Sequence, residues 1–417
     1  MRTVVRSCRQ RLQLQPAVLM RLKEKSMLNV ARTFSVRILP HWSRDSLILS
    51  TTLLILLSLM LLFIVAPLAA MLVKSVQNEQ GEFVGLAYFA QYFSSAALWQ
   101  SLRNTLVLGI SVTAIVGILA FIADRWVQKK QQSLFDTRSV AYQPAPHRLR
   151  DGLCLLYCVL ICVAIVAVLA TAVYGSLVTF WPWNTALTLK HYQFAETSAY
   201  GWSPYFNSLT LASLTALCGT VIIFLGAYSI EKGRVFALLR QAMQMLSMVP
   251  MAVPGLVLGL GYIFFFNHAS NPLNGLYGGM LLLVINTVVH YYTVGHMTAV
   301  TALKQLPPEL EATAASIKLP QYRLLWKVTL PVSLPAVLDI ASYLFINALT
   351  TTSAVVFLYS TDTVPASVAV LNMDDAGQTG AAAAMAVMIM LSAALAKLLH
   401  VGLEFGLFGR LQAWRKR

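Results

Sequence analysis

Long apolar blocks with almost no charged residues dominate this chain of 417 residues. A helix needs about 20 mainly apolar residues to cross a bilayer, and each block reaches that length. Charged residues make up 11% of the chain, less than half the roughly 25% that is typical of soluble domains. The sequence therefore predicts an all-α integral membrane protein and excludes the secreted, fibrous and disordered classes. The eight predicted spans are Leu47–Val73, Asn104–Ala123, Leu153–Thr179, Asn207–Ile230, Ala242–Phe266, Tyr277–Val300, Pro331–Leu358 and Gly380–Val401.

The basic residues alternate along the chain. All but Lys74, Arg103 and Lys190 of the 31 Lys and Arg residues fall in five segments: 1–46, 124–151, 231–241, 301–330 and the end from Lys397 onward. Lys and Arg accumulate in cytoplasmic segments, so this alternation predicts eight spans with both termini in the cytoplasm. The net charge of +15 then reflects the basic cytoplasmic segments and an attraction of the N-terminal segment to membrane lipids. We expect no nucleic acid as a partner.

The first block is preceded by a long basic segment and is too long for a cleaved signal peptide, so we expect a retained span. A weak internal repeat follows, in which Asn104-Thr-Leu106 parallels Asn207-Ser-Leu209. Loss of the middle of one copy of a duplicated module would explain it, and chance similarity is the alternative. The predicted organisation is a basic segment (1–46), a partial first repeat of two spans (47–130), a linker (131–152), a six-span module (153–403) and a basic tail (404–417).

The loop 301–330 has the most specific content of the basic segments. Pro307-Pro308 suits the first turn of a helix, and Glu309 and Glu311 follow where the helix dipole favours negative charge. The small residues Ala312–Ser316 come next, and Leu319-Pro320 ends this helix. A second short helix, Gln321–Val328, leads into the seventh span. Two short helices with small side chains predict a docking surface for a partner, and an amphipathic loop resting on the membrane is the alternative.

This loop resembles the Glu-Ala-Ala loop of ATP-binding-cassette importer permeases, which ends in Ile/Val-x-Leu-Pro. The matching residues are Glu311-Ala312 and Val328-Thr329-Leu330-Pro331, with one residue more between them than is usual and Lys318 in place of a glycine. The resemblance implies a type I permease module of six helices, in which this loop is the coupling helix that docks on the ATPase. By this resemblance the coupling residues are Glu309, Glu311, Ala312, Ala314, Ala315, Ser316, Lys318, Leu330 and Pro331.

The resemblance also implies partners. A permease of this class works with a dimer of cytoplasmic ATPase subunits, a periplasmic substrate-binding protein and a second permease module, either another copy or a second subunit. The phosphate-binding pattern G-x-x-x-x-G-K-[ST] is missing from the sequence, so we expect ATP and Mg²⁺ to bind the partner. The chain itself is then a multi-pass inner-membrane protein and not an enzyme, with no cofactor of its own.

The segments Tyr343–Asn347 and Ala366–Gly377 are similar to permeases for 2-aminoethylphosphonate, within the ferric-iron, thiamine and polyamine branch. This similarity predicts phosphonate transport. Uptake of ferric iron, thiamine or a polyamine such as spermidine or putrescine is the alternative, as is a truncated, non-transporting assembly subunit.

Polar residues inside the spans are candidates for the cargo path, because charged groups in a bilayer tend to face protein or water. Asp339 could contact a cationic cargo or pair with a neighbouring helix. Asn347, Thr350 and Thr351 could line a wet path or bond to helix carbonyls. Asn286 and His290 could line the path or pack within the core, and no metal site is predicted because a carboxylate shell is missing.

Three acids lie in the last predicted external loop, which has no basic residue. They are Asp362, Asp374 and Asp375. We expect them to contact a basic patch on the substrate-binding protein, and simple solvation is the alternative.

Overall fold

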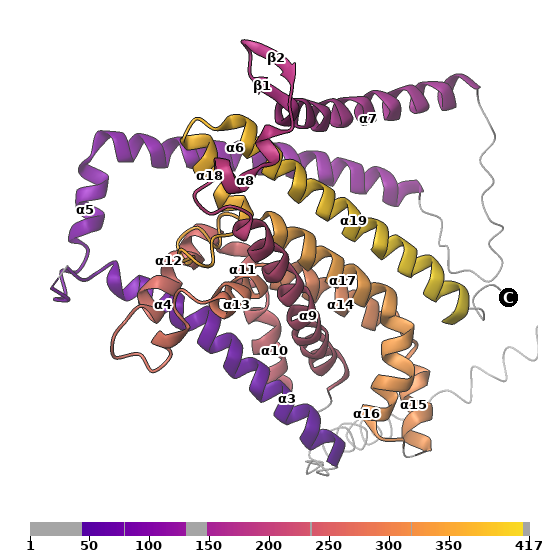
Figure 1. Ribbon diagram of the computed structural model, residues 1–417. Coiled ribbons are helices and arrows are strands. Elements are labelled where there is room, and N and C mark those ends of the chain that lie inside the picture. The colour runs from indigo at the N-terminus through magenta and orange to yellow at the C-terminus, as the bar shows by residue number, and fades with distance from the viewer. Residues whose placement is uncertain (1–43, 79, 131–147, 234–235, 318, 412–417) are drawn as a thin grey trace, which may run out of the picture.

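The structure is a computed structural model that describes residues 44–78, 80–130, 148–233, 236–317 and 319–411 (Figure 1). Predicted features in 1–43, 131–147 and 412–417 lie outside the described residues. The helices and strands are α3 (Arg44–Met60), the π-helix η1 (Leu61–Val65), α4 (Ala66–Lys74), α5 (Ala87–Ser94), α6 (Ala96–Lys130), α7 (Arg148–Leu177), β1 (Val178–Phe180), β2 (Asn184–Leu187), η2 (Lys190–Tyr192), α8 (Phe194–Thr197), α9 (Ser203–Lys232), α10 (Ala237–Leu246), α11 (Val249–Ala252), α12 (Gly255–Phe266), η3 (Asn274–Leu276), α13 (Met280–His290), α14 (Tyr292–Lys304), α15 (Pro308–Ser316), α16 (Gln321–Leu324), the π-helix η4 (Leu325–Thr329), α17 (Leu330–Thr350), α18 (Ala366–Asp375) and α19 (Thr379–Leu411).

The predicted all-α membrane architecture is confirmed. Within the described residues, six helices are long and apolar enough to cross a membrane, and two bent helix pairs bring the number to as many as eight. The two strands form only a small antiparallel hairpin between α7 and α9. Each of the eight predicted blocks corresponds to one of these helices or bent pairs.

Three of the predicted spans are interrupted. The fifth bends by 110° between α11 and α12, where Val253 is extended ahead of Pro254, as expected for a residue that precedes proline. The sixth bends by 54° between α13 and α14. The seventh ends at Thr350, so the predicted end at Leu358 is wrong. Thr351 has an extended backbone, and the chain continues through largely buried turns to α18.

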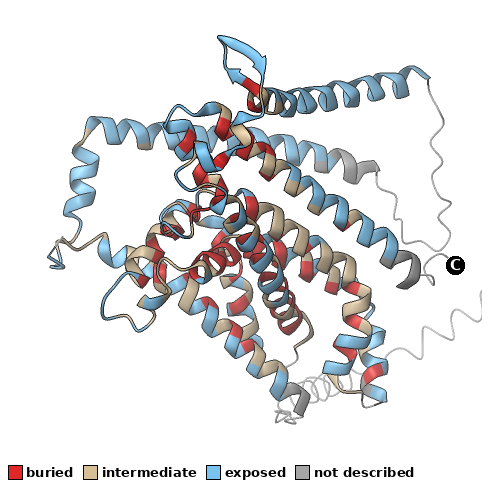
Figure 2. Ribbon diagram, in the orientation of Figure 1, coloured by how far each residue is buried: buried red, intermediate tan, exposed pale blue. Residues whose placement is uncertain are grey.

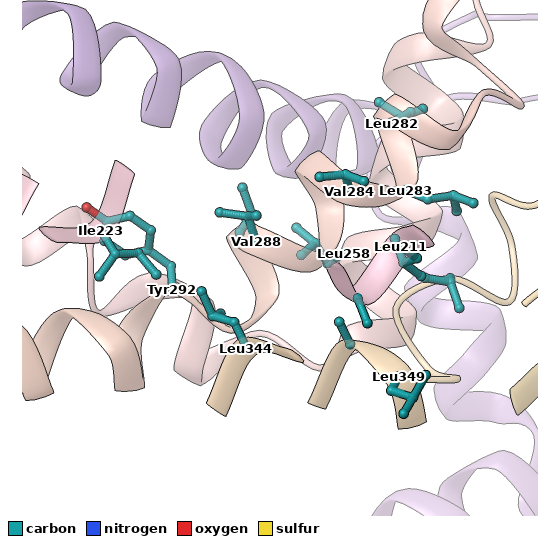
Figure 3. Close-up of a cluster of buried hydrophobic side chains, with 14 of the residues drawn as sticks. Leu211, Ile223, Leu258, Leu282, Leu283, Val284, Val288, Tyr292, Leu344 and Leu349 are labelled. Carbon is teal, nitrogen blue, oxygen red and sulfur yellow. The ribbon is translucent and has the colours of Figure 1, made fainter. Parts of the chain in front are cut away.

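The core of the bundle surrounds α9, which packs against α13, α14 and α17. Figure 3 shows Ile223 of α9 close to Tyr292 of α14, with Val288 and Leu344 beside them. Small residues allow this close approach. A Cβ atom at Gly219 would lie 2.8 Å from Cδ1 of Leu344, so α9 and α17 can approach this closely only because Gly219 has no side chain.

The first span packs against the same core. Pro67 has no N–H to donate to the Phe63 carbonyl four residues earlier, and the Tyr262 hydroxyl of α12 donates to that carbonyl over 2.8 Å. In Figure 2 the helices α6 and α7 are almost wholly exposed, whereas α9 is red along much of its length. The division of the chain into a partial repeat and a module stays a prediction.

Candidate functional site

The segment 308–329 forms a projection at one end of the bundle, which we call the α15–α16 knob. It consists of α15, α16 and η4, and η4 continues directly into α17. In Figure 1 the knob lies at the opposite end of the bundle from α18. The 21 residues of α17 separate the two ends by about 30 Å, at about 1.5 Å per helical residue. Helix α15 therefore lies at one end of the bundle, whereas α16 and η4 belong to the stretch Gln321–Thr350 that is long and apolar enough to cross a membrane.

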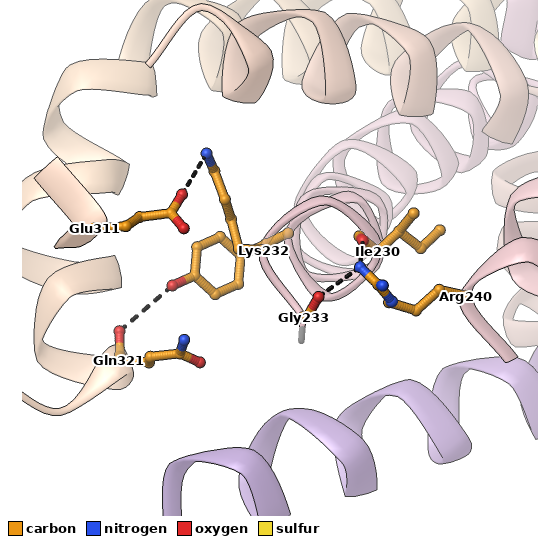
Figure 4. Close-up of polar contacts among 7 residues, drawn as sticks. Ile230, Lys232, Gly233, Arg240, Glu311 and Gln321 are labelled. Carbon is orange, nitrogen blue, oxygen red and sulfur yellow. Dashed lines mark hydrogen bonds and ion pairs between the residues drawn. The ribbon is translucent and has the colours of Figure 1, made fainter. Parts of the chain in front are cut away.

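One face of α15 is attached to the bundle. The Lys232 ammonium nitrogen, in the last turn of α9, lies 2.7 Å from Oε1 of Glu311 (Figure 4). Ala314 is three residues further along α15 and is only 5% exposed. Residues three apart lie on the same face of a helix, so Glu311 and Ala314 both face the protein itself. Ala314 is therefore not on the exposed face of α15, and its role in coupling stays a prediction.

The other face of α15 is open to solvent. Ala312, Ser316 and Ile317 are exposed, and Ile317 exposes 68% of its surface. The Ser316 hydroxyl donates to the Ala312 carbonyl within the helix. The exposed side of α15 thus carries small and polar side chains, with the exposed Ile317 directly after its last residue.

Exposed aromatic residues of α16 and η4 lie further along the knob. Trp326 is 64% exposed and Tyr322 is also exposed, with the Arg323 guanidinium 5.7 Å from the Tyr322 ring centroid. Both aromatic residues lie at the start of the stretch Gln321–Thr350, which is itself long and apolar enough to cross a membrane, so lipid as well as a partner can contact their exposed sides. The sequence analysis gave no role to Tyr322 and Trp326, although an aromatic pair within a basic loop is a readable signal.

The remaining predicted coupling residues have different surroundings. Glu309 is exposed at the first turn of α15, and Leu330 and Pro331 are half-buried where η4 meets α17. Ala315 lies within α15, but its side chain is not among those described, and Lys318 lies outside the described residues.

Asn286, His290 and Thr351 lie near one place where the interrupted spans meet. A Cβ atom at Gly255, the first residue of α12, would be 3.2 Å from Cε1 of His290 and 3.1 Å from the Ala354 nitrogen. Asn286 is fully buried and donates to the Ala354 carbonyl over 2.7 Å. Thr351, also buried, accepts a hydrogen bond from Ser367 through its carbonyl. The breaks in the fifth, sixth and seventh spans therefore converge at this place.

Asp339 lies apart from that junction, on α17. Its carboxylate is 3.4 Å from Nε2 of His400 on α19, which is buried. It also lines a cavity of about 1050 Å³ between α11, α14 and α17, together with Met248, Met297 and Thr301. Among the described residues that line this cavity, Asp339 is the only charged one.

Asn347 and Thr350, the other predicted path residues of α17, each donate a hydrogen bond within the helix. The Asn347 amide donates to the Tyr343 carbonyl, and the Thr350 hydroxyl donates to the Ile346 carbonyl. Neither residue lines the cavity beside Asp339. Their contribution to a cargo path stays a prediction.

The three acids predicted to contact a binding protein are exposed. Asp374 and Asp375 lie at the C-terminal end of α18, and Asp362 lies in the turns before it, where its carbonyl accepts from Asn207. All three are at the end of the bundle opposite the knob (Figure 1). Within the described part of the chain, groups of three or more His, Cys, Asp or Glu residues that could hold a metal ion are absent.

A bundle of interrupted helices that are long and apolar enough to cross a membrane, with a small helical knob at one end, is the architecture of a polytopic membrane protein. Residues 219–408 match the family described as the binding-protein-dependent transport system inner membrane component. The chain belongs to this family of ATP-binding-cassette importer permeases. It is therefore a multi-pass inner-membrane protein and a membrane transport subunit in kind, not an enzyme.

Curated relatives carry the same family features. The ferric transport system permease protein FbpB of Actinobacillus pleuropneumoniae is 31% identical over 218 residues, which cover 51% of this chain and 30% of that protein. The Fe(3+)-transport system permease protein FbpB 2 of Haemophilus influenzae is 29% identical over 34% of this chain and 27% of that protein. The chain thus spans less than a third of the length of these two relatives. A ferric transport system permease-like protein of Escherichia coli, AfuB, is 35% identical over 80 residues and is covered for 67% of its length.

The fold is also that of solved importers. A bacterial ABC transporter involved in the import of the acidic polysaccharide alginate has a chain that superposes with a TM-score of 0.50 at 16% identity. The match covers 63% of this chain and 99% of that one. At this identity the likeness shows the fold alone.

Proposed function

We propose that this protein is a permease subunit that moves its cargo across the inner membrane by alternating access, driven by a separate ATPase. The observation that carries the proposal is the α15–α16 knob. Its inner face is fixed to α9 by the Lys232–Glu311 ion pair, and its outer face exposes Ala312, Ser316 and Ile317. A cytoplasmic subunit that binds this knob and moves can displace it, and the knob is attached to α9, the helix at the centre of the bundle.

Ferric iron is the cargo that is best supported. The curated relatives described above are named for ferric transport, so ferric iron replaces the phosphonate that the sequence motifs predicted. The Asp339 carboxylate in the cavity of about 1050 Å³ supports a cationic cargo, because hard metal cations prefer oxygen ligands.

The partners follow from the two ends of the bundle. We place the knob in the cytoplasm against a dimer of ATPase subunits, in agreement with the basic residues of loop 301–330. Asp362, Asp374 and Asp375 then face the periplasm, where they contact a substrate-binding protein. A second permease module, from another copy or another subunit, supplies the second knob for the second ATPase subunit.

The docking surface can be tested by substituting its most exposed apolar residue. Ile317→Glu places a charge directly after α15, at the most exposed apolar residue of the knob, and should reduce co-purification of the cognate ATPase at least tenfold. Phe83→Glu is the matched control, because Phe83 is 79% exposed in the loop after α4, away from the knob. Equal ATPase recovery with both variants would contradict docking at the knob.

The cargo can be tested in membrane vesicles that contain the protein, its ATPase and its binding protein. We expect ATP-dependent uptake of radiolabelled Fe³⁺ and little uptake of labelled 2-aminoethylphosphonate. Asp339→Asn should lower iron uptake by about tenfold while ATPase co-purification is retained. Preferential phosphonate uptake would restore the cargo that the sequence motifs predicted.

A further inference from the structure

The last turn of α9 is attached to three other elements at once. Lys232 forms the ion pair with Glu311 of α15. The Tyr228 hydroxyl, one turn earlier, donates to the Gln321 carbonyl at the start of α16 over 3.5 Å. From the other side, the Arg240 guanidinium of α10 donates to the carbonyls of Ile230 and Gly233 (Figure 4). Both helices of the knob and the following helix α10 therefore meet at one helix end.

These contacts differ in their chemistry. The Arg240 bonds satisfy carbonyls that the end of a helix leaves without a partner, so they cap α9. The bond from Tyr228 is long and therefore weak. The Lys232–Glu311 pair is short and charge-assisted, and its side chains are only 13% and 28% exposed. Among these contacts between the knob and α9, the ion pair is the strong and directional one.

Because α9 lies at the centre of the bundle, a movement of its last turn affects several other helices. Side chains of α9 pack against α13, α14 and α17, and Gly219 and Gly226 bring neighbouring side chains close to its backbone. These three helices also contain or border the interruptions of the sixth and seventh spans, which lie close to Gly255 of the interrupted fifth span. A displacement of the last turn of α9 would thus be passed to the helices that contain the interruptions. The chain connection through η4 moves only α17 directly.

We propose that the Lys232–Glu311 ion pair is the link through which a movement of the knob is transmitted to α9, so that Lys232 is a positioning residue for coupling. This inference rests on the proposed function. In this arrangement Glu311 uses its carboxylate within the chain, and the partner contacts the opposite face of α15. Loss of the pair should leave the outer face able to bind the ATPase but should separate ATP hydrolysis from cargo movement.

The test uses the assembled complex in proteoliposomes and measures three quantities: ATPase co-purification, ATP hydrolysis, and cargo uptake per ATP hydrolysed. Lys232→Met keeps the length of the side chain and removes its charge. We expect ATPase co-purification within twofold of the unsubstituted protein and a fall in uptake per ATP of at least tenfold. The charge exchange Lys232→Glu with Glu311→Lys should recover at least half of the lost coupling, whereas a purely structural role would lower assembly and hydrolysis together.

Lys304→Met is the matched control, because Lys304 is an exposed residue at the end of α14, close to the knob in sequence. It should leave all three quantities within twofold. Uptake per ATP that is unchanged in Lys232→Met, or a charge exchange that recovers nothing, would overturn the inference. If the unsubstituted protein binds no ATPase and moves no cargo, the proposed function is itself wrong, and the inference falls with it.

Discussion

The first span and α6 are alike in sequence and different in structure. The spans Leu47–Lys74 and Ala96–Ala123 both have 28 residues and have almost the same mean hydropathy. In the most apolar window of the first span, 28% of the residues are buried within the protein, whereas in the corresponding window of α6 none is buried. Hydropathy therefore indicates that a helix can lie in lipid, but it does not indicate whether the helix also packs against other helices of the protein.

The first span is partly buried and α6 is not because, of the two, only the first span packs closely against α12. Gly261 of α12 allows the Pro67 backbone of the first span to approach, because a Cβ atom at this position would lie 2.9 Å from the Pro67 carbonyl oxygen. Phe63 stacks on Phe266 with ring centroids 6.0 Å apart. In α6, added Cβ atoms at Gly109 and Gly117 would meet nothing within 4 Å. Small residues at contacts are the usual means by which membrane helices associate, since lipid is as apolar as the side chains.

The largest expected effect is that of Gly261→Leu. The new side chain would force the Pro67 backbone away and separate the first span from α12, so we expect a loss of about 3 kcal/mol in the free energy of unfolding. Gly117→Leu on α6 is the matched control and should change it by less than about 0.5 kcal/mol. Unfolding in mixed micelles with increasing SDS measures both, and equal effects would show that the first span does not pack as described.

A smaller effect is expected for Leu53→Ala. Leu53 of α3 is 2% exposed and belongs to the core, so truncation leaves a cavity. We expect a loss of about 2 kcal/mol, near the lower end for buried leucines, because unfolding within a membrane does not transfer the side chain to water. Leu119→Ala on α6, where Leu119 is exposed, should be nearly neutral in the same titration. A cost for Leu119 as large as that for Leu53 would mean that α6 is also packed against protein.

The smallest effect is expected for Tyr262→Phe. This variant keeps the ring and removes only the hydroxyl that donates to the Phe63 carbonyl. A loss of about 1 kcal/mol is expected, which is typical of a single hydrogen bond. Tyr157→Phe on the exposed helix α7 should have no measurable effect. If Tyr262→Phe proves as neutral as its control, η1 is held by packing alone.

The number and approximate position of the spans could be predicted because they depend on runs of apolar residues. The bend at Pro254 had a readable cause in the Pro and Gly residues of the fifth span. The end of the seventh span at Thr350 did not, because the apolar residues Val355, Val356 and Leu358 continue past it. Val355 and Leu358 are buried in turns, and hydropathy does not distinguish a buried turn from a helix.

For the α15–α16 knob, too, the sequence indicated the position in the chain but not the orientation of the side chains. The sequence placed the knob correctly between the sixth and seventh spans and marked Glu311 and Ala312. It did not show that Ala314 faces inward, since the orientation of a short helix depends on contacts with distant residues such as Lys232. The partner of Glu311 is almost 80 residues away in the chain, and only the folded arrangement brings the two charges together.

The most direct test of the account is photo-crosslinking from Ile317 in native membranes. A photoreactive amino acid at Ile317 should give an adduct with the mass of the protein plus the ATPase subunit, and the yield should change when ATP is added. The same group at Trp183, exposed between β1 and β2 at the other end of the bundle, should give no such adduct. An ATPase adduct from Trp183, or none from Ile317, would contradict the claim that the knob is the place where the ATPase acts on this permease.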